Sequence, residues 1–164
     1  MRLTRNIFVV DFFTEIVIIL VFAAIVGTVE LFTSPTGILH WGSQAIVRID
    51  DGTYVYAEIA DDAEERRVGL SEHVFLDPDR GILFLFDEPS RPAFWMKDMD
   101  FPIDIIWLRD GTVVGIESDV QPSNETIPPS VRPIVDIDQV LEVNAGFAKE
   151  HGLKTGQMLD IKLP

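Results

Sequence analysis

The chain has 164 residues, enough for one compact domain and an appendage, and its 27 Asp and Glu outnumber its 13 Lys and Arg, giving a formal net charge of −14. A surface this acidic repels phosphate backbones, so nucleic acid is not an expected partner. The chain has no cysteine, and none of its three histidines is spaced as a metal-ligand pair, so we expect no disulfide, no metal and no cofactor.

The N-terminal segment has the pattern of a membrane anchor. Residues 1–6 are basic, and residues 7–32 are mostly apolar and longer than the roughly 20 residues that span a bilayer. The positive-inside rule places the basic end in the cytoplasm. We therefore predict a cytoplasmic tail (1–6), a single-pass anchor in the lipid bilayer of the cell membrane (7–32), a linker (33–43) and an outer domain. A cleaved signal peptide or a buried helix is the alternative.

From residue 44 to 163, short apolar runs alternate with turn signals, as in β-rich domains. Asp61 or Asp62 can cap a short helix through Glu64 or Glu65, and Gly69 can end it. Most runs are joined by turns, so we predict antiparallel strands in a mainly β (α+β) fold, either a jelly-roll-like sandwich or a partly open barrel. The expected strands are 44–49, 54–60, 82–87, 103–108, 112–118, 135–143 (one or two strands) and 157–163, and the expected helices are 61–70 and 145–152.

The stretch FWMKDMDFPIDIIWL, residues 94–108, places charged residues inside an apolar run. In the strand expected at its end, alternate residues share a face, so Ile103, Ile105 and Trp107 lie opposite Asp104, Ile106 and Leu108. Asp104 is thus expected on an apolar face, where an unpaired carboxylate is unfavourable.

Lys97 is the expected partner of Asp104 if the chain folds back at Pro102, and Arg67 or main-chain N–H groups are alternatives. A buried ion pair that fixes the bend is one interpretation. The other is a carboxylate in a pocket that serves as an acid/base group or a ligand anchor, with Asp104 and Lys97 as candidate catalytic residues.

Aromatic and basic residues near this stretch are candidates for ligand binding. Trp95, Met96 and Trp107 can line a pocket for a sugar or an apolar ligand, with Arg67 as a further candidate, although plain core packing is the alternative. Paired aspartates could suit calcium, but no EF-hand loop pattern is present, and no metal site is predicted. Asn124 begins a glycosylation acceptor motif in the polar loop 121–130.

Four segments occur in a characteristic order: ERRVGLS, GILFLF, FWMKDMDFPIDIIWL and VLEVNAGFAKEHGLKTGQ. Together, over residues 44–163, they resemble the domain of unknown function 192 family (uncharacterised protein family 0127) of bacteria and archaea. The resemblance implies a mainly β domain grouped with jelly-roll-like sandwiches, plus short helices, and implies no activity, cofactor or catalytic residue. The chain departs from the family at Asp98, where Asn is usual, and at Ile103, where Leu is frequent.

These observations predict a membrane-anchored extracytoplasmic module that binds a surface carbohydrate, a small molecule or a protein partner. An enzyme built on Asp104 and Lys97 is the alternative. The segment AGFAKEHGLKTGQML loosely resembles part of swapped-hairpin DNA-binding proteins, but the acidic charge argues against that role.

Overall fold

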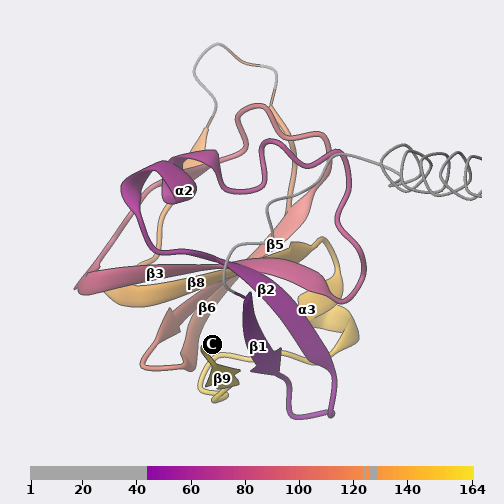
Figure 1. Cartoon of the computed structure of the whole chain (residues 1–164), viewed down its shortest axis with the longest axis vertical. Coiled ribbons are helices and arrows are strands. Elements are labelled where there is room, and N and C mark those ends of the chain that lie inside the picture. Colours follow the sequence, from indigo (N-terminus) through magenta and orange to yellow (C-terminus); the bar gives the residue numbers. More distant parts are fainter. Residues whose placement is uncertain (1–43, 124, 126–128) are drawn as a thin grey trace, which may run out of the picture. The chain divides into compact units, whose positions relative to one another are not determined.

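The computed structural model describes residues 44–123, 125 and 129–164 (Figure 1). The predicted anchor, the linker and the acceptor Asn124 lie outside these residues and stay predictions. Within the described ranges, no helix is long and apolar enough to cross a bilayer.

The described part of the chain is mainly β, with two short helices. Seven strands form one sheet in the order β6–β5–β8–β3–β2–β1–β9, and β4 pairs with β7 in a separate two-stranded sheet. The strands are β1 (Gln44–Arg48), β2 (Tyr54–Ala60), β3 (Arg80–Ser90), β4 (Phe94–Trp95), β5 (Ile103–Arg109), β6 (Thr112–Val120), β7 (Ser130–Val131), β8 (Ile137–Asn144) and β9 (Asp160–Lys162), and the helices are α2 (Ala63–Val68) and α3 (Phe147–Glu150).

One strand pairing departs from the expected antiparallel pattern. β2 and β3 are parallel, whereas the other neighbours in both sheets are antiparallel. Parallel neighbours need a long crossover connection, and here the chain passes through α2 between the two strands. The predicted antiparallel pairing is therefore found for the other neighbouring strands and not for β2 and β3.

The large sheet curls, so its two ends approach each other. β9 pairs with β1 at one end, and the segment just before β9 contacts the start of β6 at the other. There the Val113 N–H donates to the Gln157 carbonyl at 2.8 Å, and the Leu159 N–H donates to the Gly111 carbonyl at 2.9 Å. The result is a half-barrel, closer to the partly open barrel of the prediction than to the sandwich.

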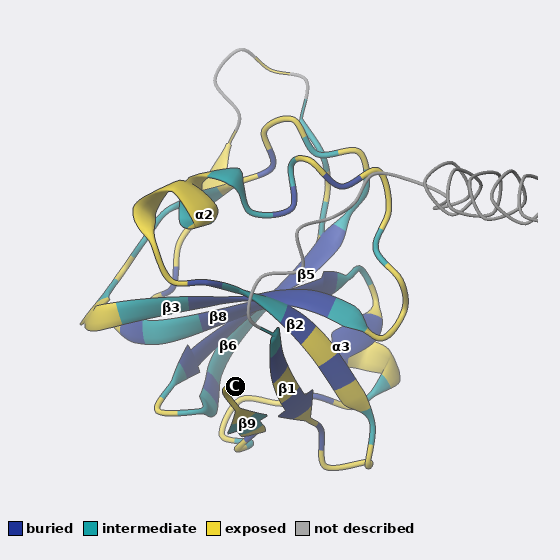
Figure 2. Ribbon diagram, in the orientation of Figure 1, coloured by how far each residue is buried: buried dark blue, intermediate teal, exposed yellow. Residues whose placement is uncertain are grey.

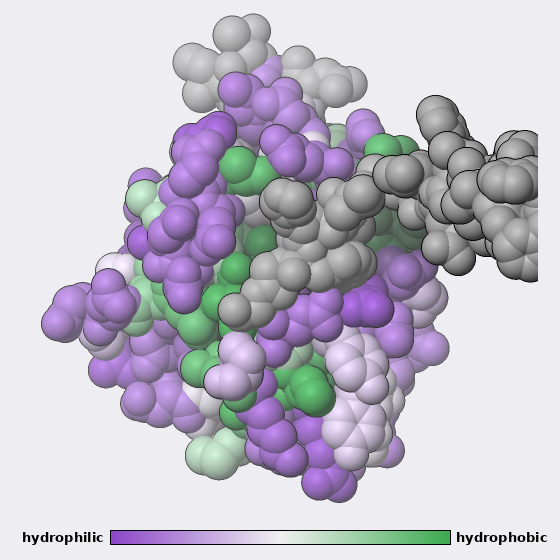
Figure 3. Space-filling model, in the orientation of Figure 1, coloured by the Kyte–Doolittle hydropathy of each residue, from purple (hydrophilic) through white to green (hydrophobic). Residues whose placement is uncertain are grey.

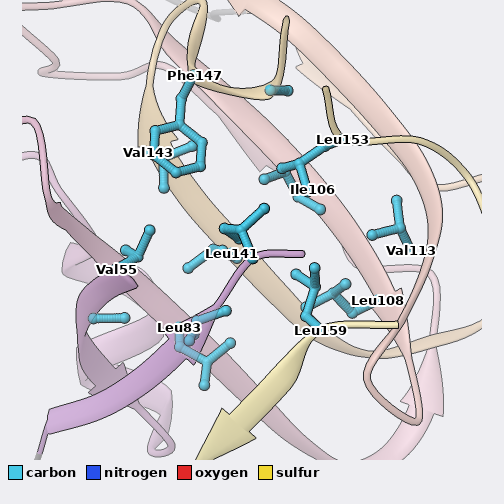
Figure 4. Close-up of a cluster of buried hydrophobic side chains, with 14 of the residues drawn as sticks. Val55, Leu83, Ile106, Leu108, Val113, Leu141, Val143, Phe147, Leu153 and Leu159 are labelled. Atoms are coloured by element: carbon cyan, nitrogen blue, oxygen red, sulfur yellow. The ribbon is translucent and has the colours of Figure 1, made fainter. Parts of the chain in front are cut away.

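Apolar side chains fill both faces of the curled sheet. The inner cluster, within the curl, includes Val55, Leu83, Ile106, Leu141 and Phe147 (Figure 4). The outer cluster lies on the opposite face and includes Leu70, Ile82, Phe84, Met96, Ile103, Ile105, Trp107 and Val140. β5 and β8 run through the middle of both clusters and are largely buried (Figure 2).

Helix α2 begins and ends as the sequence predicts. The Asp62 carboxylate accepts from the N–H groups of Glu64 and Glu65, both at 2.8 Å, and the Glu65 side chain completes the capping box. Gly69 ends the helix with a positive φ of 49°, and a Cβ there would lie 3.3 Å from the ring of Phe84. This close approach brings the end of α2 against the outer cluster.

Candidate functional site

A cavity of about 230 Å³ lies beside the end of α2, over the outer cluster. Its walls come from the end of α2 and the turn after it, from β3, and from the segment around β4. The apolar part of the lining consists mainly of Leu70, Phe84, Phe86, Phe94, Met96 and Ile103. In Figure 3, green hydrophobic surface is visible beside the purple surface of α2.

Glu142 is the acidic residue of this cavity. It lies on the central strand β8, directly opposite Ile82 of β3 and Ile105 of β5, so apolar side chains flank it on both sides. It is only 6 % exposed, and it has no hydrogen-bond or ion-pair partner among the residues that the structure describes. Burial raises its pKa to about 8, so the carboxyl group is mostly protonated at pH 7.

Three basic residues line the same cavity. Arg66 is held against the protein, because its Nη1 donates to the carbonyls of Asp61 and Leu85 and its guanidinium lies 5.3 Å from the centre of the Phe86 ring. Arg67 is more exposed and donates to the Glu64 carboxylate at 2.9 Å and 2.5 Å, which lowers the pKa of Glu64 and raises that of Arg67.

Lys97 is the third basic residue, and its side chain is 60 % exposed, with Nζ 3.7 Å from an oxygen of Asp98. A surface pair at this distance holds a side chain only weakly. Lys97 can therefore turn toward a ligand in the cavity, whereas Arg67 would have to exchange its exposed pairing with Glu64 for a ligand.

Several of the predicted ligand-binding residues come together in this cavity. Arg67, Trp95 and Met96 all line it, with Met96 buried and Trp95 53 % exposed. Trp107 does not line the cavity. It is only 2 % exposed and packs edge-on against Phe94 in the outer cluster, with 5.3 Å between the ring centroids. Core packing, the alternative, is thus the arrangement found for Trp107.

Asp104 lies on the other face of the sheet, as the alternation along β5 predicts. It is fully buried, and its carboxylate accepts three main-chain N–H groups: Asp119 at 2.9 Å, Gly146 at 3.1 Å and Ala148 at 2.9 Å. Gly146 is the N-cap of α3 and has no capping side chain of its own. Asp104 thus caps α3 from a neighbouring strand.

The same carboxylate also holds an irregularity in the β5–β6 pair. The register shifts between Ile103 and Ile105, and Asp119 on β6 adopts a positive φ of 56°. This is the geometry of a β-bulge, and the hydrogen bond from the Asp119 N–H to Asp104 occurs at it.

The predicted ion pair between Lys97 and Asp104 is wrong, and the alternative of main-chain partners is confirmed. Lys97 contacts Asp98 on the surface, whereas Asp104 is enclosed by amide groups on the opposite face. The two side chains cannot form one acid/base unit. The residues described contain no group of three His, Asp or Glu side chains arranged to hold a metal ion.

Glu142 is not among the predicted site residues, although the sequence contains a signal for it. The run QVLEV places Glu142 on the same face as Val140, with Leu141 and Val143 on the other, in a strand that is apolar on both faces. An acidic residue in the middle of such a strand indicates a buried carboxyl group.

Two solved structures are similar to this chain. A crystal structure of a Sinorhizobium meliloti protein described as a candidate transcription regulator matches with 27 % identity and a TM-score of 0.65, over 77 % of this chain and 98 % of that one. A Novosphingobium aromaticivorans protein of unknown function matches with 28 % identity and a TM-score of 0.64, over 71 % of this chain and 83 % of that one.

No curated protein matches the chain. The family model named DUF192 and described as uncharacterized ACR matches residues 45–161, which is most of the chain and nearly all of the described domain. The chain belongs to the DUF192 family.

Proposed function

We propose that this protein is a membrane-tethered binding module whose ligand is a small molecule held in the cavity beside α2. The observation that carries the proposal is Glu142, a carboxyl group that is buried in an apolar wall without a partner in the described part of the chain. Buried polar groups are nearly always hydrogen-bonded, because leaving one unsatisfied costs about 1 to 3 kcal/mol. A ligand in the cavity would supply the missing partner.

The lining supports a ligand site over a simple packing gap. Binding pockets are mostly apolar with a few convergent polar groups, and they often contain a residue with a perturbed pKa. This cavity combines aromatic and aliphatic walls with Glu142, Arg67 and Lys97. The half-exposed Trp95 adds an aromatic ring at its edge.

Filling the cavity should abolish ligand binding. We expect that small fragments (acids, amines, amides and sugars) which raise the melting temperature of the full-length chain will have no effect on an Ala93→Phe variant, because Ala93 lines the cavity. Ala63→Phe is the matched control, since Ala63 is exposed on α2 and lies outside the lining. Fragments that stabilise all three proteins equally, or none of them, would contradict a ligand site here.

The tether is proposed from the sequence of residues 7–32 and has its own test. Protease added to intact cells should digest the domain while a cytoplasmic marker protein stays intact, because the basic N-terminus should remain inside. The chain should also stay with the membrane fraction after alkaline carbonate extraction. Protection of the domain together with the marker would reverse the proposed orientation.

An enzymatic role is the second candidate, and it now rests on Glu142. A general acid works best with a pKa near the operating pH, and the raised pKa of about 8 meets that condition. Asp104 no longer supports this role, because its hydrogen bonds serve α3 and the β5–β6 bulge. The net charge of −14 opposes DNA binding, which argues against the transcription-regulator role by which the Sinorhizobium relative is described.

A further inference from the structure

We propose that the cavity beside α2 selects a small organic acid that carries a further oxygen-containing group besides its carboxylate. Its carboxylate would bind at Arg67 and Lys97, and a carbonyl, ether or hydroxyl oxygen on its apolar body would face Glu142. This inference rests on the proposed binding function and names the chemical class of its ligand.

The charge of the lining favours an anion. The cavity gathers three basic side chains, Arg66, Arg67 and Lys97, in a protein whose net charge is −14. They are the charged residues that line the cavity besides Glu142, whose strand neighbours Ile82 on β3 and Ile105 on β5 are apolar. Because Glu142 is mostly protonated at pH 7, the lining is positive overall.

Glu142 supplies the second recognition element. A protonated carboxyl group has an O–H donor, which a carboxylate lacks. This donor has no acceptor among the residues that the structure describes, so an oxygen of the ligand can satisfy it without displacing a protein contact. The cavity therefore favours a ligand that carries an acceptor oxygen in addition to its carboxylate.

Size and wall chemistry define the rest of the ligand. The cavity volume of about 230 Å³ lies below the roughly 300–1,000 Å³ that is typical of drug-sized pockets, so the occupant is small. The walls of the cavity include Phe84, Met96 and Ile103, which favour a short aliphatic body over a polyol.

A set of three matched probes separates these elements. Levulinate has both a carboxylate and a ketone, pentanoate lacks the ketone, and methyl levulinate lacks the charge. We expect calorimetric titration of the full-length chain, in a mild non-ionic detergent, to show levulinate binding about tenfold more tightly than either of the other two. A tenfold ratio corresponds to about 1.4 kcal/mol, within the range of one satisfied buried hydrogen bond.

The pH dependence gives an independent readout of Glu142. Levulinate should bind about tenfold more weakly at pH 9 than at pH 7, because ionisation above about pH 8 removes the donor and introduces a negative charge. A Glu142→Gln variant retains an N–H donor, so it should bind levulinate with little pH dependence. A Glu142→Leu variant, which lacks any donor, should bind levulinate no better than pentanoate.

The same titrations test whether Arg67 and Lys97 bind the carboxylate of the ligand. Arg67→Gln combined with Lys97→Gln should weaken levulinate about tenfold and leave methyl levulinate unchanged. Lys149→Gln is the control, because Lys149 is exposed on α3, which packs on the opposite face of the sheet.

Two results would overturn the inference while leaving the binding function in place. One is equal affinity for levulinate and methyl levulinate. The other is no binding of any of the three probes, while other fragments still bind the wild-type chain and not Ala93→Phe. If no fragment of any class binds the cavity, the proposed binding function itself fails.

Discussion

Replacing Glu142 with Gln should stabilise the protein by an amount that grows with pH. The carboxyl group has an ordinary pKa of 4.5 in the unfolded chain and about 8 in the folded one. Between these values the unfolded chain releases the proton and the folded chain retains it, so the free energy of unfolding falls by about 1.4 kcal/mol per pH unit. Glutamine has nearly the same shape and does not ionise.

The difference in the free energy of unfolding between Glu142→Gln and the wild type should therefore be near zero well below pH 4.5, where Glu142 is protonated in both the folded and the unfolded wild type. It should reach about 3 kcal/mol at pH 7 and about 4 to 5 kcal/mol above pH 8. Urea unfolding of the full-length chain, followed by tryptophan fluorescence between pH 4 and pH 9, measures this difference directly. Glu88→Gln on β3 is the control, because Glu88 is exposed, and its stability should follow that of the wild type. A constant offset between wild type and Glu142→Gln at all pH values would contradict an acid buried in neutral form.

A residue that lowers stability by this amount at neutral pH calls for a functional explanation. Natural sequences readily acquire stabilising substitutions where function permits them, and residues that are unfavourable for stability gather at functional sites. Val140, two residues earlier on the same face of β8, shows that an apolar side chain suits this wall of the sheet. Glu142 lies in the wall of a cavity that Arg67 and Lys97 also line, so the stability lost at this position is explained if Glu142 binds a ligand there.

The local features of the fold could be predicted from the sequence, because their causes are local. The period-two alternation of IDIIWL placed Ile103, Ile105 and Trp107 on one face and Asp104 on the other, and the structure confirms both placements. Asp62 and Glu65 form the expected capping box, and Gly69 ends α2 as expected. Each of these depends on residues within a few positions of one another.

Pairings between distant segments could not be derived in the same way. The parallel pairing of β2 with β3 was missed because the turns between other strands favoured antiparallel neighbours. The segment from Ala60 to Arg80 nevertheless holds a helix, which is the usual sign of a crossover between parallel strands. The small β4–β7 sheet has only two residues in each strand, too few for any periodic signal.

In the candidate site, too, contacts between distant segments could not be predicted from the sequence. Lys97, which is close in sequence, is the predicted partner of Asp104, but the partners in the structure are Asp119, Gly146 and Ala148. These residues lie 15 to 44 positions away along the chain. Glu142 was missed because its isolation depends on the strands to either side of β8, and a single strand does not reveal its neighbours.

Replacing Asp104 with Asn should destabilise the fold more than other carboxylate-to-amide changes. Asp104 is fully buried, and one of its oxygens accepts from Asp119 and Gly146 while the other accepts from Ala148. An amide group offers one oxygen and one NH₂, so a donor must face a donor at one of these positions. Losing charge-assisted bonds and leaving a buried N–H unsatisfied should lower the free energy of unfolding by about 3 kcal/mol.

The positions at which Asp104→Asn loosens the structure distinguish a structural role of Asp104 from a catalytic one. Amide hydrogen exchange should accelerate at Asp119, Gly146 and Ala148, because these N–H groups lose their common acceptor. Asp136→Asn is the matched control: that carboxylate pairs with Arg91 on the surface, and its loss should cost no more than about 1 kcal/mol. Ligand binding beside Glu142 should persist in folded Asp104→Asn protein, because the two carboxyl groups lie on opposite faces of the sheet. If Asp104→Asn kept full stability and lost binding instead, Asp104 would belong to the ligand site after all.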